Sequence, residues 1–157
     1  MNSDFTFQYG STLMREILFK AKQIDNGEWI EGSLIDLDID SGYCYIVQPY
    51  KKASILPIIF LITDRMKLVD PETLCQFTGL CDKNGNKIWE NDILMAHLDE
   101  SYPENVTYET VEWNVAGWVG RETDSIGRQY LDKFDLEHYE VVGNIFDNPE
   151  LLQEEHK

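Results

Sequence analysis

Tight-turn signals recur at short intervals along this chain, and they leave no room for a long amphipathic helix. The runs 25–27 (DNG) and 82–87 (DKNGNK) each combine Asx side chains with a glycine that accepts positive φ. Between such turns lie about nine short segments that alternate in polarity or are rich in β-branched and aromatic residues. This pattern predicts a mainly β protein, β-rich α+β at most, with small barrels or sandwiches rather than βαβ units.

The elements expected from this pattern are short. In the first strand, Ile17 and Phe19 should share the buried face. We expect loop-like backbone over 121–127, a helical turn over 131–136, and a tail helix from Pro149 to about Glu155, capped by Asn148. The expected strands are Arg15–Ala21, Glu28–Ile35, Tyr43–Val47, Ile55–Ile62 (interrupted by Pro57), Leu74–Phe77, Ile93–Leu98, Thr107–Trp113, Val115–Val119 and His138–Phe146. We expect the strand Leu74–Phe77 to end where Thr78-Gly79-Leu80 begins.

A length of 157 residues suits one domain of ordinary size or two very small ones. The composition changes after Asp70-Pro71, which makes this dipeptide the best boundary between two subdomains, 14–70 and 71–157. Neither half easily buries enough apolar surface alone. We therefore expect a single domain over 14–157 whose two β-rich parts share a core.

The charge is strongly negative and unevenly distributed. The formal net charge is −16. Residues 93–157 contribute a net −11, from 4 Lys and Arg against 15 Asp and Glu. This field opposes nucleic acid held by general electrostatics, and it opposes an anionic membrane surface. The longest apolar run, Ile55–Ile62, is also too short to span a bilayer.

The three cysteines and the N-terminal residues indicate a compartment. Cys44, Cys75 and Cys81 are odd in number and contain no C-x-x-C pair, which is not typical of a secreted disulfide framework. The first residues show no cationic segment followed by an apolar core, so no signal peptide is expected. We expect a cytoplasmic protein with reduced thiols, in which Cys44 is buried and inert.

Three ordered segments resemble one known family. Gln76, Thr78-Gly79-Leu80, Asp82-Lys83-Asn84-Gly85, Ile88, Glu90 and Asp92 match the "QyTGLkDknGkeIyegD" core of the YopX family of phage and prophage proteins. Residues 14–21 (MREILFKA) resemble the family's usual start, and residues 141–151 (VVGNIFDNPEL) resemble its close. The resemblance implies a β-rich fold with an SH3-like barrel component, a phage or prophage origin, and no established biochemical activity. Residues 1–13 precede the usual start and are expected to be a poorly ordered extension.

The 82–87 run also invites a metal interpretation. Asp82, Asn84 and Asn86 alternate as calcium ligands do at the start of an EF-hand loop. Such a loop needs glycine at its sixth position and glutamate at its twelfth, where this chain has Lys87 and Ile93. A turn built by Asx side chains is the better interpretation.

Glu90 and Asp92 are paired carboxylates that follow this turn. When such a pair is buried and close together, it can bind a metal or transfer protons, which leaves a metal-dependent hydrolase as an alternative function. A solvated or turn-capping role is the simpler interpretation. With Trp89 and the turn, these residues form the candidate recognition patch, which comprises Asp82, Asn84, Trp89, Glu90 and Asp92.

Other chemistry-bearing patterns are missing from the sequence. His97, His138 and His156 have no metal-ligand spacing, and no phosphate-binding glycine loop occurs, so we expect no metal, no cofactor and no catalytic residues. The tryptophans suit either a peptide groove or core packing. Trp113 and Trp118 lie five residues apart across an expected hairpin, which favours packing.

The function expected from the sequence is that of a non-enzymatic phage or prophage accessory protein. It would act through a protein partner, or as a homo-oligomer through exposed strand edges, with no nucleic-acid or membrane ligand. A second hypothesis is that the carboxylates of the acidic half mimic a phosphate backbone and inhibit a host DNA-binding protein. The third is the metal-dependent hydrolase that uses Glu90 and Asp92.

Overall fold

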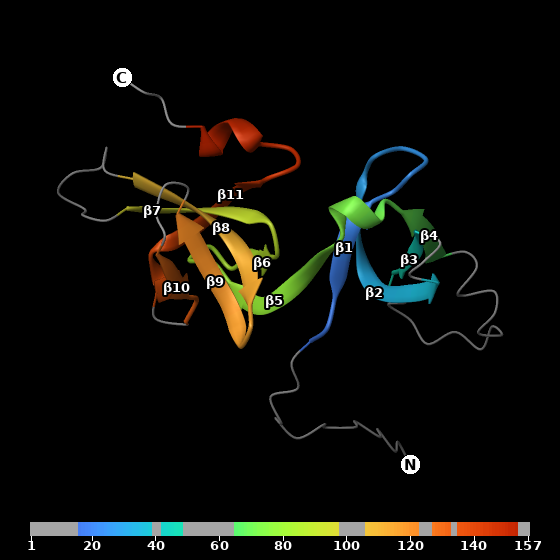
Figure 1. Cartoon of the computed structure of the whole chain (residues 1–157), viewed down its shortest axis with the longest axis horizontal. Coiled ribbons are helices and arrows are strands. Elements are labelled where there is room, and N and C mark those ends of the chain that lie inside the picture. Colours follow the sequence, from blue (N-terminus) through green and yellow to red (C-terminus); the bar gives the residue numbers. More distant parts are fainter. Residues whose placement is uncertain are drawn as a thin grey trace, which may run out of the picture.

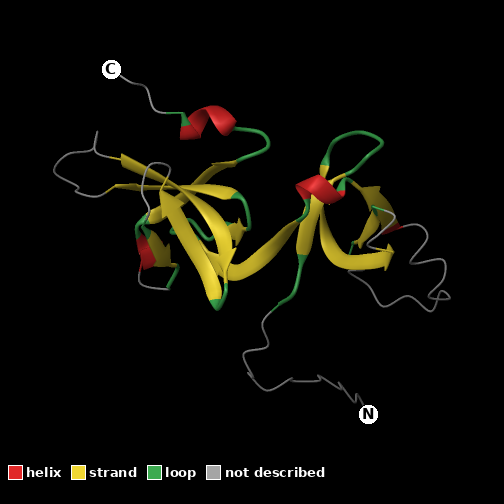
Figure 2. Ribbon diagram, in the orientation of Figure 1, coloured by secondary structure: helices red, strands yellow, loops and turns green. Residues whose placement is uncertain are grey.

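The chain folds into two antiparallel sheets joined by one strand, and the 3-10 helices among the described residues are only three or four residues long (Figure 2). We describe a computed structural model over residues 16–38, 42–48, 65–97, 106–122, 127–132 and 135–153. The expectation of a mainly β protein is confirmed. No helix within these ranges is long and apolar enough to cross a membrane.

The first sheet has six strands in the order β4-β3-β2-β1-β5-β6. Its first hairpin forms where the 25–27 run predicts a turn. Gly27 adopts φ +72°, and the Asn26 Oδ1 atom accepts a hydrogen bond of 2.9 Å from the backbone N–H of Glu28. The strands are β1 (Phe19–Lys22), β2 (Trp29–Asp38), β3 (Tyr43–Val47), β4 (Met66–Val69), β5 (Cys75–Cys81) and β6 (Lys87–Trp89), with the 3-10 turn η2 (Pro71–Thr73) between β4 and β5.

Alternation along these strands gives the six-stranded sheet one buried face. In β3, Cys44 and Ile46 are buried, whereas Tyr43 between the turn and Cys44 is exposed. Cys44 is buried as expected, and burial raises the pKa of its thiol, as do the negative charges of Asp36 and Asp70, which disfavours the reactive thiolate. The core of this sheet comprises Ala21, Ile30, Cys44, Ile46 and Val69, with Phe19, Leu34 and Leu74 packed against it.

The second sheet has five strands in the order β10-β9-β8-β7-β11. Strands β10 and β11 stand at opposite edges, and within the described residues no strand pairing joins them, so the sheet does not close into a barrel where the resemblance implied an SH3-like barrel component. Its core comprises Ile88, Leu94, Ala96, Val111, Trp118, Leu136 and Tyr139. The strands are β7 (Asp92–His97), β8 (Val106–Asn114), β9 (Gly117–Glu122), β10 (Arg128–Tyr130) and β11 (Tyr139–Asn144), with the 3-10 turns η3 (Asp135–Glu137) and η4 (Pro149–Leu152).

Strand β5 connects the two sheets, and Figure 1 shows it running from the β1–β4 side of the molecule to the β7–β11 side. It pairs with β1 at one end and with β6 at the other. A third apolar cluster of Cys75, Phe77 and Trp89, with Leu18, Trp29 and Phe146 against it, lies where the sheets meet. Strand β5 follows Pro71 in the chain but belongs to the first sheet, so the boundary between the sheets does not fall at Asp70-Pro71. The division into subdomains 14–70 and 71–157 stays a prediction.

Several local expectations differ from the structure. The segment 78–80 continues β5 instead of ending it, residues 128–130 form a strand that the sequence pattern did not show, and Ile17 is exposed. The tail forms only the 3-10 turn η4, and Asn148 makes no side-chain cap, because its Oδ1 accepts a bond of 3.4 Å from the Asn144 N–H. The expectations for 1–13 and Ile55–Ile62 fall outside the described residues.

Candidate functional site

The turn between β5 and β6 is built around one buried carboxylate, that of Asp82. Its Oδ1 atom accepts hydrogen bonds from the backbone N–H groups of Asn84 at 2.9 Å and Asn86 at 2.8 Å. Its Oδ2 atom accepts from Asn86 Nδ2 at 3.1 Å and from the N–H of Val141 in β11 at 3.0 Å. With Gly85 at φ +83°, the run forms the Asx turn predicted from the sequence, and it also ties β11 to the turn.

The ionisation of Asp82 follows from these bonds. Burial raises the pKa of its carboxyl, but the donors on Val141, Asn86 and Asn84 outweigh burial, and the net shift is downward. The carboxylate is therefore an acceptor whose oxygens are already occupied. It acts as a structural anchor rather than as a proton donor.

A second turn, Trp89-Glu90-Asn91-Asp92, passes from the six-stranded sheet to the five-stranded sheet. Asn91 adopts φ +65°, a left-handed conformation that asparagine tolerates. This conformation turns the chain so that Asp92 Oδ2 accepts a bond of 2.8 Å from the backbone N–H of Trp89. Asp92 is the first residue of β7 and is only 2% exposed.

The partner of Asp92 comes from the other sheet. Lys20 Nζ in β1 lies 2.7 Å from Asp92 Oδ1. The same ammonium lies 5.1 Å from the ring centroid of Trp29 and 5.4 Å from that of Trp89, so two indole rings hold it. Burial raises the pKa of the Asp92 carboxyl, and the attraction of Lys20 only partly compensates. The pair therefore connects the two sheets at a desolvated point.

A second ion pair lies on the same side of the molecule. Lys22 Nζ contacts Asp147 Oδ1 at 2.5 Å, and Trp29 Nε1 donates to Asp147 Oδ2 at 2.6 Å. The ring of Phe146 lies 5.9 Å from that of Trp29. Hydrogen bonds from Lys22 and Asn144 lower the pKa of Asp147 to about 2. We call this whole arrangement the junction; it comprises Lys20, Lys22, Trp29, Trp89, Asp92 and Asp147.

The five residues of the candidate recognition patch do not share one open surface. Asp82, Trp89 and Asp92 are buried in the turn and the junction. Glu90 is half-buried, and its Oε2 accepts a bond of 3.3 Å from the N–H of Gln76. Asn84 alone among the five is exposed. What the patch offers to a partner in this conformation is therefore the turn surface near Asn84.

The carboxylates that a hydrolase would need are engaged elsewhere. Both oxygens of Asp92 carry bonds, one from Lys20 and one from the backbone of Trp89, so a substrate or metal ion would have to displace Lys20. Within the described ranges, no three His, Cys, Asp or Glu side chains gather in a way that could hold a metal ion.

Exposed aromatic and apolar side chains gather at a different place, the turn between β8 and β9. Trp113 is 50% exposed although its ring meets that of Trp118 edge-on at 5.1 Å, in the pairing expected from the sequence. Val115 at the apex is 91% exposed and adopts φ +44°, which is strained for a β-branched residue. Tyr130 in the neighbouring β10 is 53% exposed, but it pairs with Val119 and therefore lies on the face opposite to Trp113, which pairs with Trp118. We call Trp113 and Val115 the hairpin tip.

A comparison with known protein families shows the family to which the chain belongs. The model of the YopX protein family matches residues 18–153, which is most of the chain. This chain belongs to the YopX family. Among solved structures, protein EF1440 from Enterococcus faecalis is similar to this chain, with a TM-score of 0.54 and 22% sequence identity. The similarity covers 89% of this chain and 100% of that one. That likeness concerns the fold. None of the curated proteins matches.

In this YopX family member, the residues that carry the family resemblance have structural partners. Asp82 organises the turn before β6, and Asp92 pairs with Lys20 across the junction. The hairpin tip lies outside the segments that match the family's core pattern. The sequence signal that could have revealed it was Asn114-Val115-Ala116, where a β-branched residue occupies a two-residue turn that normally takes glycine or asparagine.

Proposed function

We propose that this YopX family member is a phage or prophage accessory protein that binds another protein in the bacterial cytoplasm and catalyses no reaction. The observation that carries the proposal is the hairpin tip, where Trp113 and Val115 expose apolar surface at the end of the β8–β9 hairpin. Tryptophan and tyrosine are the side chains most enriched among residues that dominate binding energy in protein interfaces. The phage or prophage origin is part of the proposal and follows from the resemblance to the family.

The backbone at the tip supports the same proposal. A valine at φ +44° costs of order 1–3 kcal/mol relative to a residue that tolerates this conformation. Val115 is also almost fully exposed, so in the isolated chain its side chain returns little burial energy. A strained, exposed apolar apex is consistent with a side chain that becomes buried only when a partner binds.

The net charge favours a protein over the other macromolecules. At −16, the chain repels nucleic acid and anionic lipid over a Debye length. A protein partner with an apolar pocket needs no such general attraction. The net charge of −16 instead limits which protein surfaces can approach the chain.

The proposal is tested by quantitative capture from lysate of a bacterial host. The bait is the full chain, compared with the double variant Trp113→Ser/Val115→Asn and with the control Tyr43→Ser. Tyr43 is 56% exposed on the six-stranded sheet, so the control removes a comparable aromatic surface elsewhere. We expect proteins that wild type and the control enrich equally, and that the double variant enriches about tenfold less.

Equal enrichment by all three baits would contradict the proposal, and so would the absence of any protein enriched over beads. Native mass spectrometry of the same baits identifies a second copy of the chain as the partner, if the wild type and the control are oligomeric and the double variant is monomeric. Circular dichroism of each bait confirms that the variants are folded.

A further inference from the structure

Strand β10 is an edge of the five-stranded sheet, and all three of its residues, Arg128, Gln129 and Tyr130, are exposed. It pairs antiparallel with β9, so that Arg128 stands opposite Arg121, and Tyr130 opposite Val119. Edge strands present backbone groups that can pair with a further strand. The phase of the β9–β10 ladder decides which groups these are.

A backbone bond just beyond β10 sets this phase. The N–H of Leu131 donates to the carbonyl oxygen of Trp118 at 3.0 Å, in the same register as the strand pair. Hydrogen-bonded and non-hydrogen-bonded pairs alternate in an antiparallel ladder. Arg128 and Tyr130 are therefore in non-hydrogen-bonded pairs, and their N–H and C=O groups point away from β9 toward the free edge.

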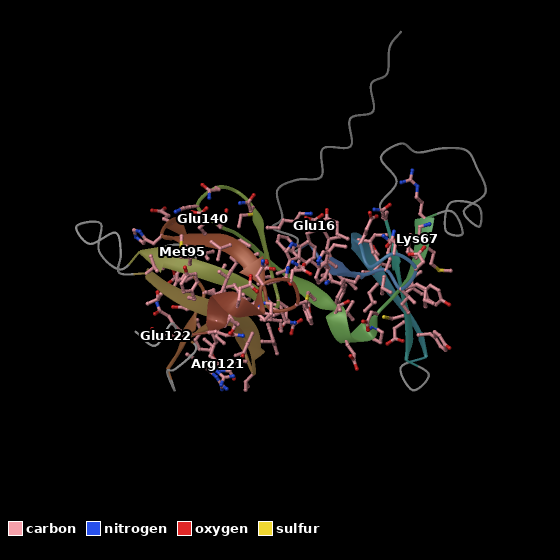
Figure 3. The ribbon with its side chains drawn as sticks, turned by 90° about the horizontal axis from the view of Figure 1, so that it is seen from above. Glu16, Lys67, Met95, Arg121, Glu122 and Glu140 are labelled. Atoms are coloured by element: carbon pink, nitrogen blue, oxygen red, sulfur yellow. The ribbon has the colours of Figure 1, made fainter. Side chains whose placement is uncertain are left out.

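The same phase brings two positive charges together. In a non-hydrogen-bonded pair the two Cα atoms are only about 4.5 Å apart, and both side chains leave the same face of the sheet. Arg128 and Arg121 form such a pair, and like charges directly opposite each other are destabilising. Figure 3 shows Arg121 projecting outward from this sheet.

Little in the described part of the chain neutralises this pair. Arg121 Nη1 contacts Glu112 Oε1 at 3.2 Å, and both side chains are partly exposed. Within the described ranges no carboxylate is recorded as an ion-pair partner of Arg128. Among the described residues, Glu112 therefore pairs with Arg121, and Arg128 has no such carboxylate, on a chain that carries 13 basic residues against 29 acidic ones.

An aromatic surface lies next to the arginines on the same face. The ring of Tyr130 lies over Gly117, where an added Cβ atom would come within 3.3 Å of ring carbon Cδ1. The missing side chain at Gly117 leaves room for the ring, and Tyr130 stays 53% exposed. The exposed part of the ring is an aromatic surface on which a partner side chain can pack.

We propose that β10 is a docking edge for an extended, acidic segment of a partner protein. The segment adds as a sixth strand, its backbone pairs with the outward N–H and C=O groups of Arg128 and Tyr130, and one carboxylate side chain binds both Arg121 and Arg128. An apolar side chain two residues along the segment packs on Tyr130, because alternate residues share a face. This inference names the partner chemistry of the proposed function and rests on it.

An extended protein segment fits better than a nucleic acid. Only a peptide backbone supplies the alternating donors and acceptors that the edge of β10 can pair with. A nucleic acid would bring many phosphates into the field of a chain with net charge −16, whereas a short segment brings one or two carboxylates.

The test is selection from a random 12-residue peptide library displayed on phage particles, with the folded full chain as bait. Parallel selections use Arg128→Glu and the control Lys67→Glu, which makes the same change of charge on β4, an edge strand of the other sheet. We expect peptides enriched in Asp or Glu from wild type and Lys67→Glu. Their affinity for Arg128→Glu should fall about tenfold, which is the loss of one charge-assisted hydrogen bond.

Backbone amide NMR locates the bound peptide. We expect the largest shifts at Arg128 and Tyr130, and none when an oligonucleotide of single-stranded DNA replaces the peptide. The inference is overturned if no acidic peptide is enriched, if Arg128→Glu binds the same peptides as wild type, or if the oligonucleotide produces those shifts. If capture depends on Trp113 and Val115 while peptides ignore Arg128, this inference fails and the proposed function stands.

Discussion

The junction and the hairpin tip use the same residue types in opposite ways. At the junction, the ammonium of Lys20 lies between two indole rings and against a buried carboxylate. At the tip, Trp113 leaves about half of its surface in solvent, and on the nearby strand β10 Arg128 faces another arginine instead of an acid. The junction pairs its charged groups within the chain, whereas the tip leaves apolar surface in solvent.

This difference separates the residues that carry the family resemblance from the residues that we propose as a binding surface. The "TGL…DKNG…WEND" segment is the most distinctive in the sequence, and its side chains hold the turn and the junction. The tip arises from ordinary strand sequence. In this protein the distinctive motif holds the two sheets together, and the surface that we propose for partner binding is marked by exposed apolar side chains instead.

The largest expected effect tests whether the junction depends on its buried ion pair. Asp92→Ala should lower the free energy of unfolding by about 4 kcal/mol, because it leaves the Lys20 ammonium buried without its carboxylate. The double variant Lys20→Met/Asp92→Leu should recover most of this loss, since an apolar pair needs no desolvation of charge. Urea unfolding measures both. A loss below about 1 kcal/mol for Asp92→Ala would show that the pair does not hold the sheets together.

The next effect concerns the turn. Asp82→Ala should cost about 3 kcal/mol, because three backbone N–H groups and the Asn86 amide lose their acceptor. Asn84→Ala is the matched control: its side chain is exposed, so its stability should stay within about 0.5 kcal/mol of wild type. Thermal unfolding of both variants checks this. Equal losses would mean that the turn sequence, not the carboxylate, stabilises the fold.

At the hairpin tip the expected change has the opposite sign. Val115→Asn should raise the free energy of unfolding by about 1 kcal/mol, because asparagine tolerates the left-handed conformation that strains valine. Val115→Thr keeps the β-branch and should bring no gain. A destabilising Val115→Asn would mean that the valine contributes to the fold of the hairpin, and the contrast between tip and junction would weaken.

The smallest expected effect is a pH dependence at the junction. The pKa of Asp147 is lowered to about 2, so its stabilising contribution is complete above about pH 4 and is lost as the pH falls toward about 2. Since this side chain is 36% exposed, the contribution should be only about 0.5 kcal/mol. The difference in unfolding free energy between wild type and Asp147→Asn should therefore vanish near pH 2. A constant difference would contradict the ion pair with Lys22.

Asp92 should titrate with the opposite sign. Its pKa is raised by burial, so the folded state holds its proton to higher pH than the unfolded state does. The contribution of this group to stability therefore decreases as the pH rises above about 4. The slope should persist in Asp147→Asn and disappear in the Lys20→Met/Asp92→Leu variant.

Local chemistry made much of the fold predictable from the sequence. The DNG and DKNGNK runs contain the side chains that bond their own backbone and the glycines that accept positive φ, so both turns lie where expected. Strand β3 has the bounds that the apolar run after Gly42 predicted, Tyr43–Val47. These features depend on neighbours within a few residues, which the sequence displays directly.

Other features depended on contacts between distant residues. Lys20 and Asp92 lie 72 positions apart, and nothing in either local sequence selects the other as its partner. Strand β10 was missed because Arg128-Gln129-Tyr130 shows no alternation of its own and becomes a strand through pairing with β9. The candidate patch was placed on the surface because burial of Trp89 and Asp92 results from two sheets meeting there.

The sequence by itself determined the family, the turns, most strands and the predominance of negative charge, because these follow from composition and from short-range backbone chemistry. Only the tertiary structure decided which carboxylates lie buried against lysine, which aromatic rings stay in solvent, and which strand forms an edge. Those outcomes are set by the pairing of strands far apart in the chain, since pairing determines both the face that a side chain takes and what covers it.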